Sequence, residues 1–179
     1  MDNKKYWEEF YKKNHTMKES PFAEYCESLL PIDYRIIEFG SGNGRDTYFF
    51  ASKGFNIVGV DYACWPENLR DNVCFIQSDL SDYLKNNFNK FDVVYTRFFL
   101  HSITKQEISS LLDWTENLLC VEFRSKDDVP LIYTNHERTV VDEDELLKEM
   151  KEKGYEIYYY FKGTGVARYK EEDPIVVRI

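Results

Sequence analysis

Three glycines on alternate positions mark the part of this sequence best suited to bind a ligand. Gly40, Gly42 and Gly44 follow a short apolar run at residues 35–39 and precede a segment with helical patterning. Glycine permits a positive φ and lets a ligand approach the backbone, because no Cβ stands in the way. The following helix offers unpaired N–H groups and a positive dipole end to an anionic group. This order of strand, turn and helix predicts a ligand-binding loop.

An acidic residue follows the next apolar run at a suggestive distance. Residues 56–60 form a second predicted strand, and Asp61 ends it about twenty residues after the glycine turn. A carboxylate at that point can accept hydrogen bonds from two ribose hydroxyls. The first half of the chain therefore predicts a site for a cofactor that carries adenosine. A dinucleotide fold uses the same turn and acidic strand end, so a dinucleotide is an alternative on this pattern alone.

Arg97 and His101 follow the fourth predicted strand, at the edge where ligands bind in open parallel sheets. His101 is a candidate general base or acceptor-binding donor, because the pKa of histidine lies near neutral pH. The alternative is a structural histidine that packs and hydrogen-bonds. Arg97 precedes the apolar run 98–100, and an arginine in apolar surroundings requires an anionic partner.

More cationic residues surround an irregular segment after the fifth predicted strand. Arg124, His136 and Arg138 flank this segment, and Arg168 lies in a later loop rich in Lys and Glu. Together with Arg97 they form a candidate pocket for phosphate or carboxylate, because arginine binds such groups in a bidentate way. Scattered surface charge is the alternative interpretation.

Composition restricts the classes of protein to which the chain belongs. Its 179 residues suit one domain with one core, and 43% hydrophobic residues exclude a disordered chain. No apolar run is long enough to span a membrane, and the N-terminus lacks the apolar core of a secretion signal. The four cysteines and three histidines show no metal-type spacing, so we expect no metal site and no disulfide framework. A cytoplasmic location is the default.

The net charge of −9 argues against broad nucleic-acid binding and against an anionic membrane surface. No motif of the Asn-Pro-Pro-Tyr type follows the fourth predicted strand, which also disfavours a nucleic-acid substrate. A small anionic substrate remains compatible with this charge, because a local arginine cluster outweighs it at short range. The sequence does not determine the oligomeric state.

The elements that must position these groups alternate between strand and helix, which implies right-handed crossovers and a mostly parallel sheet. Strands are predicted at residues 35–39, 56–60, 73–77, 91–96, 118–123, 155–162 and 174–179, and helices at 4–14, 45–53, 81–84 and 142–153. Two further helices begin after Ser20 and Thr104, while Ser81 is expected to cap the helix at 81–84. The last two strands are joined by a loop alone, so one of them should run antiparallel.

With these motifs in place, the chain resembles the class I S-adenosylmethionine-dependent methyltransferases over nearly its whole length. Residues 38–44 are similar to that family's cofactor loop, and residues 91–94 to the strand that enters its catalytic region. The resemblance implies an α/β fold with three layers, a Rossmann-like seven-stranded mostly parallel sheet and an antiparallel last strand. It also implies S-adenosyl-L-methionine as the cofactor, S-adenosyl-L-homocysteine as its product, and no metal.

The resemblance assigns roles to particular residues. Asp61 matches the ribose-binding acid and Asp79 the residue beside the adenine amino group, although Asp79 is also a candidate helix cap. Glu38 neutralises the cofactor's amino group or pairs with a neighbouring cation. The expected cofactor-binding residues are Glu38, Gly40, Ser41, Gly42, Asp46, Asp61, Tyr62, Asp79, Leu80 and Thr96.

Aromatic residues near the N-terminus have two compatible interpretations. Trp7, Tyr11 and Phe22 pack helices onto the sheet, and they are placed to form a lid over the cofactor, since aromatic faces attract cations. We expect a single methyltransferase domain over residues 1–179 with an N-terminal helical lid at about residues 4–30. Trp7, Tyr11, Arg124, His136, Arg138 and Arg168 are the candidate acceptor-binding residues, and His101 and Arg97 the candidate catalytic ones.

A narrower resemblance suggests the acceptor. Segments 20–23, 97–101, 122–124, 136–138 and 172–174 are similar to small bacterial methyltransferases encoded with surface and capsular polysaccharide pathways. Some of those proteins act on sugars or on sugar-linked phosphate and phosphoramidate groups. The resemblance therefore implies methylation of a small, anionic acceptor, most simply at oxygen. The alternatives are a methyltransferase for another small metabolite and a non-catalytic S-adenosylmethionine-binding partner subunit.

Overall fold

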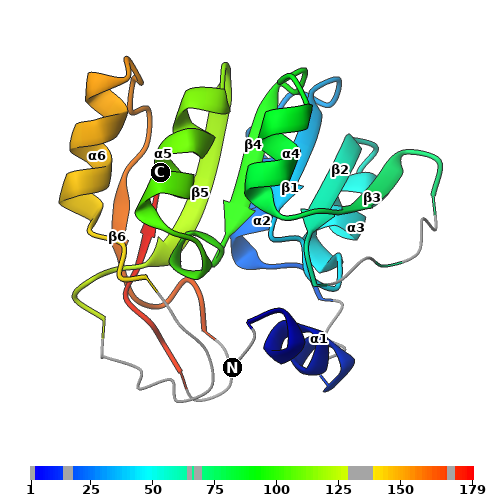
Figure 1. The fold of residues 1–179 in the computed structure, drawn as a ribbon, viewed down its shortest axis with the longest axis horizontal. Helices are drawn as coiled ribbons and strands as arrows, with labels where there is room; N and C mark the ends of the chain where they lie inside the picture. The colour runs from blue at the N-terminus through cyan, green and yellow to red at the C-terminus, as the bar shows by residue number, and fades with distance from the viewer. Residues whose placement is uncertain (1–2, 14–17, 64–65, 67–69, 129–138, 169–171) are drawn as a thin grey trace.

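The computed structural model describes residues 3–13, 18–63, 66, 70–128, 139–168 and 172–179. Their strands form one seven-stranded sheet in the order β3-β2-β1-β4-β5-β7-β6 (Figure 1). The strands are β1 (Arg35–Phe39), β2 (Asn56–Asp61), β3 (Val73–Gln77), β4 (Val93–Arg97), β5 (Leu118–Arg124), β6 (Phe161–Gly163) and β7 (Val176–Arg178). β1 to β5 are parallel, whereas β7 runs antiparallel to both β5 and β6. The predicted fold class is confirmed.

Helices cover both faces of the sheet. They are α1 (Asn3–Lys13), α2 (Pro21–Glu27), α3 (Arg45–Ser52), α4 (Leu80–Asn86), α5 (Lys105–Trp114) and α6 (Glu143–Glu152), with a short 3₁₀ helix, η1, at Leu100–Ser102. In Figure 1, α4, α5 and α6 lie in front of the sheet and α2 and α3 behind it. Each face has its own cluster of buried apolar side chains, so the sheet is the middle layer of three.

Local capping sequences fix where several helices begin. The Ser20 side chain accepts a hydrogen bond from the Ala23 backbone N–H, and Thr104 and Glu107 form the expected capping box. The expectation for α4 was wrong, because Asp79 and not Ser81 is its N-cap. Asp79 accepts from the Asp82 backbone N–H at 2.8 Å, so the N-cap lies two residues before the predicted one.

The predicted strand over residues 155–162 was mostly wrong. Only Phe161–Gly163 forms strand β6, and Tyr155, Tyr158, Tyr159 and Tyr160 lie outside it. The physical reason is the length of β7, whose last residue, Arg178, is paired with Phe161. Residues that precede Phe161 therefore extend past the end of β7, the strand with which β6 pairs.

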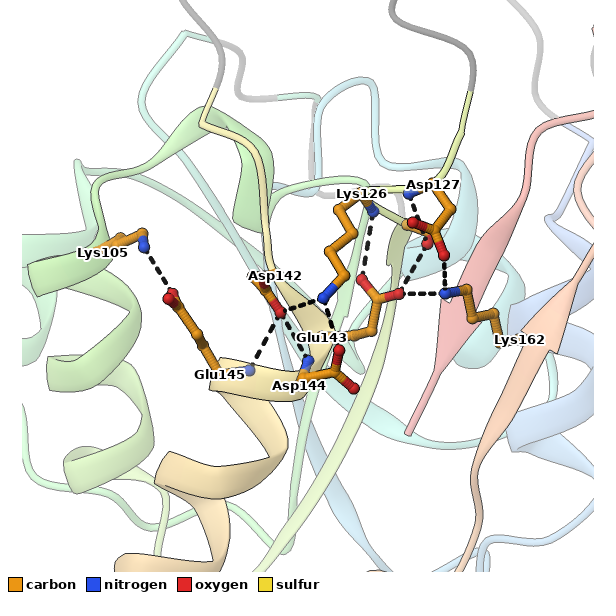
Figure 2. Close-up of polar contacts among 9 residues, drawn as sticks. Lys105, Lys126, Asp127, Asp142, Glu143, Asp144, Glu145 and Lys162 are labelled. Atoms are coloured by element: carbon orange, nitrogen blue, oxygen red, sulfur yellow. Dashed lines mark hydrogen bonds and ion pairs between the residues drawn. The ribbon is translucent and has the colours of Figure 1, made fainter.

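A buried carboxylate joins the end of β5 to the start of α6. Glu143 has an exposed fraction of only 1% and accepts from Ser125 Oγ at 2.9 Å and from Lys162 Nζ at 2.5 Å. Figure 2 shows Glu143 between Lys126 and Lys162, with Asp142 bound to the Lys126 ammonium at 2.8 Å. Burial raises the pKa of Glu143, but the hydrogen bonds, led by that from Lys162, outweigh it and leave the pKa below its ordinary value. This network fixes both flanks of the segment that follows β5.

Two searches of the described residues gave negative results. No helix among them is long and apolar enough to cross a membrane. No group of three or more His, Cys, Asp or Glu side chains among them is arranged to hold a metal ion.

Candidate active site

The glycine loop lies between β1 and α3 in a conformation that requires glycine. Gly40, Gly42 and Gly44 have φ values of 75°, 54° and 78°. A Cβ on Gly40 would lie 2.6 Å from the Phe99 ring, and one on Gly42 would overlap the ring of Tyr11. The backbone N–H of Gly40 donates to the Val60 carbonyl at 2.9 Å, which holds the loop against β2. Backbone strain and close packing therefore both explain the glycines.

Asp61 is fixed beside this loop by two backbone donors. Gly42 N–H donates to Asp61 Oδ2 at 3.0 Å and Ala63 N–H to Oδ1 at 2.8 Å. Asp79 follows the neighbouring strand and caps α4, as the structural alternative predicted. Asp61 and Asp79 nevertheless line the same cavity, so capping and ligand binding remain compatible for Asp79.

Asp46 is the centre of a buried hydrogen-bond network that connects three elements. It has an exposed fraction of 3% and accepts from Ser20 N–H at 2.8 Å, Ser20 Oγ at 2.7 Å and the Tyr95 hydroxyl at 2.9 Å. Arg45 Nε lies 3.5 Å from Asp46 Oδ1. The sequence had shown Ser20 only as a helix cap, and nothing in the local pattern marked Tyr95, an interior residue of β4.

Glu38 adds a second buried carboxylate next to Asp46. It accepts a hydrogen bond from Thr47 Oγ1 at 2.5 Å. Burial, followed by the nearby Asp46 carboxylate, holds the pKa of Glu38 well above its ordinary value. Both carboxylates line the cavity. Two adjacent buried acids form a wall that favours a cationic group.

A third buried carboxylate is held by two arginines, of which Arg97 lines the cavity. Glu122 is fully buried; its Oε1 accepts from Arg97 Nε and its Oε2 from Arg178 Nε, each at 2.6 Å. The Arg97 guanidinium also lies over the Phe98 ring, 4.2 Å from the ring centroid. The anionic partner predicted for Arg97 is thus a residue of the protein. Arg97 lines the cavity, so this partner does not remove it from the candidate site.

His101 and Arg124 line the same cavity as Arg97. His101 lies in η1 with an exposed fraction of 6%, and its ring centroid is 6.2 Å from that of Phe98. Arg124 donates to Asp128 at 2.8 Å and to Glu172 at 2.5 Å. Arg97, His101 and Arg124, which come from three different elements, all line the cavity.

The remaining candidate acceptor residues differ in their placement. Arg168 lines the cavity but is largely exposed, and it pairs with Asp173 at 3.1 Å. Trp7 and Tyr11 of α1 also line it, with stacked rings 5.9 Å apart. His136 and Arg138 lie outside the described residues.

One cavity of about 630 Å³ contains nearly all of the expected cofactor residues. Gly42 and Thr96 are the exceptions: the Tyr11 ring covers Gly42, and Thr96 is fully buried. Within the described part of the chain, Ser41 Oγ and Thr96 Oγ1 are buried without a hydrogen-bond partner. Such groups are costly unless a ligand or water satisfies them. The orphaned Ser41 hydroxyl, the carboxylate wall and the fixed Asp61 fit a cofactor with ribose hydroxyls and a cationic group.

Comparisons with known proteins agree with this geometry. A family model described as a methyltransferase domain matches residues 14–160. A search of curated proteins found no significant match. Among solved structures, the fold resembles a 1,6-didemethyltoxoflavin N1-methyltransferase from Burkholderia thailandensis, solved with bound 1,6-didemethyltoxoflavin and S-adenosylhomocysteine. The TM-score is 0.71 at 17% identity over 88% of this chain and 75% of that one.

Two further structures show the range of chemistry that this fold supports. The glycopeptide N-methyltransferase MtfA with S-adenosylhomocysteine has a TM-score of 0.64 at 14% identity, over 90% of this chain and 89% of that one. The [4+2]-cyclase SpnF has a TM-score of 0.62 at 17% identity, over 78% of this chain and 58% of that one. At these identities the structures establish the shared fold alone. The chain belongs to the methyltransferase domain family and has the fold of a class I S-adenosylmethionine-dependent methyltransferase.

Proposed function

We propose that this protein transfers a methyl group from S-adenosylmethionine to a small acceptor bound among Arg97, His101 and Arg124. The observation that carries the proposal is the single cavity, which joins these three residues to the glycine loop and Asp61. The cofactor supplies a methyl group that its sulfonium charge already activates. The chain's own residues then have to bind, orient and exclude water, and good alignment of reactants contributes up to about 7–11 kcal/mol.

Within this proposal, each wall of the cavity has its own task. Asp61 accepts hydrogen bonds from the ribose, Asp79 binds near the adenine, and Glu38 and Asp46 balance the charge of the amino group. Tyr62, Leu80 and the loop residues complete the contacts. Trp7 and Tyr11 form the inner face of an N-terminal helical lid over a single domain.

We further propose that the acceptor is anionic and is methylated at oxygen. The support comes from the charges of three residues: the single carboxylate of Glu122 accepts hydrogen bonds from two guanidinium groups, those of Arg97 and Arg178. The Glu122 cluster therefore carries one surplus positive charge in a buried position, and an uncompensated buried charge is costly. Arg97 is its member at the cavity wall, so an anionic acceptor group there would balance the surplus.

The role of His101 depends on the acceptor. If the acceptor is a sugar hydroxyl, His101 takes its proton as the general base. If it is a phosphate or phosphoramidate oxygen, that oxygen is already ionised, and His101 binds it together with Arg97 and Arg124. The setting in cytoplasmic surface-polysaccharide synthesis rests on the sequence resemblance and is part of the proposal.

The first experiment is calorimetric titration with S-adenosylhomocysteine of the wild-type protein and of Asp61→Ala. We expect binding that the substitution abolishes, because the carboxylate is fixed at the loop. A folded wild-type protein that does not bind would contradict the proposal. Phe88→Ala is a control, since Phe88 is 94% exposed and does not line the cavity.

Turnover with anionic sugars, sugar phosphates and phosphoramidates then separates the remaining alternatives. A large loss of kcat in His101→Ala with intact cofactor binding supports a base, whereas a rise in acceptor KM alone supports binding. Turnover only with neutral metabolites would overturn the anionic acceptor. Cofactor binding without any turnover, together with a stable complex with a second protein, would favour the non-catalytic partner subunit.

A further inference from the structure

Phe98 has a strained backbone at the wall of the candidate active site. Its φ of 52° lies in the left-handed region, and in the part of the chain that the structure describes it is the one residue other than glycine with a positive φ. A bulky side chain is rare in this region, because its Cβ approaches the neighbouring carbonyl oxygen. Such strain persists only where surrounding contacts fix it, and it is typical of active sites and ligand clamps.

The chain is held on both sides of this residue. The Phe98 backbone N–H donates to the Glu122 carbonyl at 2.8 Å, which attaches the end of β4 to β5. The Glu122 carboxylate accepts from Arg97 Nε at 2.6 Å. After the turn, the Ser102 N–H donates to the Phe99 carbonyl at 2.8 Å and closes η1. Phe98 therefore has to make the turn between β4 and η1.

This turn places the Phe98 ring among the cationic side chains of the site. The guanidinium carbon of Arg97 lies 4.2 Å from the ring centroid and that of Arg124 lies 6.0 Å from it. The His101 ring centroid is 6.2 Å away. All four residues line the cavity. An aromatic face attracts a guanidinium and favours one placement of it, so the ring restricts Arg97, its closest cationic neighbour.

The two guanidinium groups differ in how many of their nitrogens are in use. Arg124 donates to two carboxylates, those of Asp128 and Glu172. Arg97 donates to Glu122 through Nε, and within the described residues its two terminal nitrogens have no hydrogen-bond partner. The Arg97 side chain is nevertheless only 12% exposed. The parallel N–H groups of a guanidinium match two oxygens of a phosphate or carboxylate, so Arg97 has the donors that such a group requires.

We propose that Phe98 is a positioning residue, which holds the Arg97 guanidinium so that its two terminal nitrogens bind one oxyanion of the acceptor. This inference rests on the proposed function and adds the residue that orients its acceptor-binding arginine. Glu122 fixes Nε and the Phe98 ring holds the guanidinium carbon, so two contacts restrict the direction of the terminal nitrogens. A side chain that is held before binding loses less conformational freedom when the ligand arrives.

The test is titration of the full chain with inorganic phosphate at constant ionic strength, followed by NMR of the arginine Nε–H groups. The Arg97 signal is the one that is missing in Arg97→Ala. Phe98→Leu should raise the phosphate Kd measured at Arg97 by about fivefold or more, because it removes the aromatic face. Leucine also has a Cβ, so the backbone strain remains and the difference reports the ring. Phe98→Tyr keeps the face and should bind phosphate within about twofold of wild type.

Phe49→Leu is the matched control. Phe49 is half-buried like Phe98 and has Lys53 Nζ 5.3 Å from its ring centroid, but neither Phe49 nor Lys53 lines the cavity. The same substitution at this position should leave the phosphate affinity unchanged, and thermal unfolding establishes that each variant is folded. A loss in Phe98→Leu that is absent from both Phe98→Tyr and Phe49→Leu supports the proposal. Three results overturn it: no phosphate response at Arg97 in the wild-type protein, wild-type affinity in Phe98→Leu, or an equal loss in Phe49→Leu.

Titration of the same samples with S-adenosylhomocysteine separates this inference from the proposed function. The phosphate titration needs no cofactor, so a wild-type protein that binds phosphate at Arg97 but not S-adenosylhomocysteine contradicts the methyltransferase proposal. The phosphate affinities of the variants then still decide the role of Phe98. A protein that binds S-adenosylhomocysteine and whose Phe98→Leu variant keeps its phosphate affinity overturns the role of Phe98 alone.

Discussion

Two regions around the candidate active site differ in the balance of their buried acidic and basic groups. At the cofactor end, Glu38 and Asp46 place two carboxylates side by side, with Arg45 as the nearby cation. At the acceptor end, the carboxylate of Glu122 meets two guanidinium groups. The first arrangement favours a cationic group, and in the proposed function the second receives an anionic acceptor. The proposal therefore gives the cavity two differently charged regions that orient its ligands, even though the whole chain is strongly acidic.

The largest expected effect follows from removing the carboxylate at the acceptor end. In Glu122→Gln, two buried arginines lose their counter-charge, so the free energy of unfolding should fall by about 3–5 kcal/mol. Chemical denaturation measures this value. Glu172→Gln is the matched control, because its partner Arg124 is shared with Asp128 and its side chain is 51% exposed. Glu172→Gln should lower the free energy of unfolding by at most about 1 kcal/mol. Equal losses in both variants would contradict the special role of the buried Glu122 carboxylate.

Removing Arg97 should weaken acceptor binding more than it lowers stability. Arg97→Ala leaves Glu122 paired with Arg178, so the cluster becomes neutral and the fold should tolerate the change better than Glu122→Gln. The loss of a charged hydrogen bond should instead weaken acceptor binding by about 1.5–3 kcal/mol. Steady-state kinetics should show a raised acceptor KM with unchanged S-adenosylhomocysteine affinity. Arg35→Ala is the control, because the Arg35 side chain is 52% exposed and does not line the cavity, and an equal rise in KM there would contradict this role for Arg97.

At the cofactor end, Asp46→Asn tests whether the second carboxylate is structural or electrostatic. The amide has one acceptor oxygen in place of two, so the Ser20 N–H on Oδ1 and the two hydroxyls on Oδ2 cannot all be satisfied, and stability should fall by about 1–3 kcal/mol. Affinity for S-adenosylhomocysteine should fall as well, because the wall loses negative charge. Tyr95→Phe removes one hydrogen bond and keeps both carboxylates. If that variant loses as much affinity, the charge of Asp46 does not matter.

The raised pKa of Glu38 predicts a pH dependence with a definite sign. Between its ordinary and its raised pKa, Glu38 is protonated in the free protein, and a bound cationic group favours the ionised form. Binding should therefore release a proton, and affinity should rise with pH and level off above the raised pKa. At low pH, protonated Glu38 contributes to the free energy of unfolding of the ligand-free protein. This contribution is lost as pH rises through the raised pKa of Glu38.

Calorimetry in buffers of different ionisation enthalpy measures this proton release. Glu38→Gln should abolish it, and the variant should retain more of its stability than the wild-type protein as pH rises. Each unit of pKa change corresponds to about 1.4 kcal/mol of binding energy. Binding without proton release at any pH would show that the cation does not reach Glu38.

Patterns confined to a few neighbouring residues were predictable from the sequence. The glycines at 40, 42 and 44 were identified because their backbone requirement is local, and the caps at Ser20 and Thr104 were found for the same reason. The failure at α4 is also instructive. Asp79 and Ser81 are both good caps, and sequence alone does not show which one the preceding strand leaves in the capping position.

The tertiary structure decided where the charges meet. Asp46 finds Ser20 and Tyr95, 26 and 49 residues away, and Glu122 finds Arg178, 56 residues away. These pairs depend on which strands become neighbours, and the position of β7 between β5 and β6 brings Arg178 beside Glu122. The sequence by itself determined the loop, the acidic strand end and the α/β alternation, since each is encoded locally. Which buried acidic and basic side chains become neighbours depends on the folded sheet, because residues remote in the chain become partners only when the strand order is set.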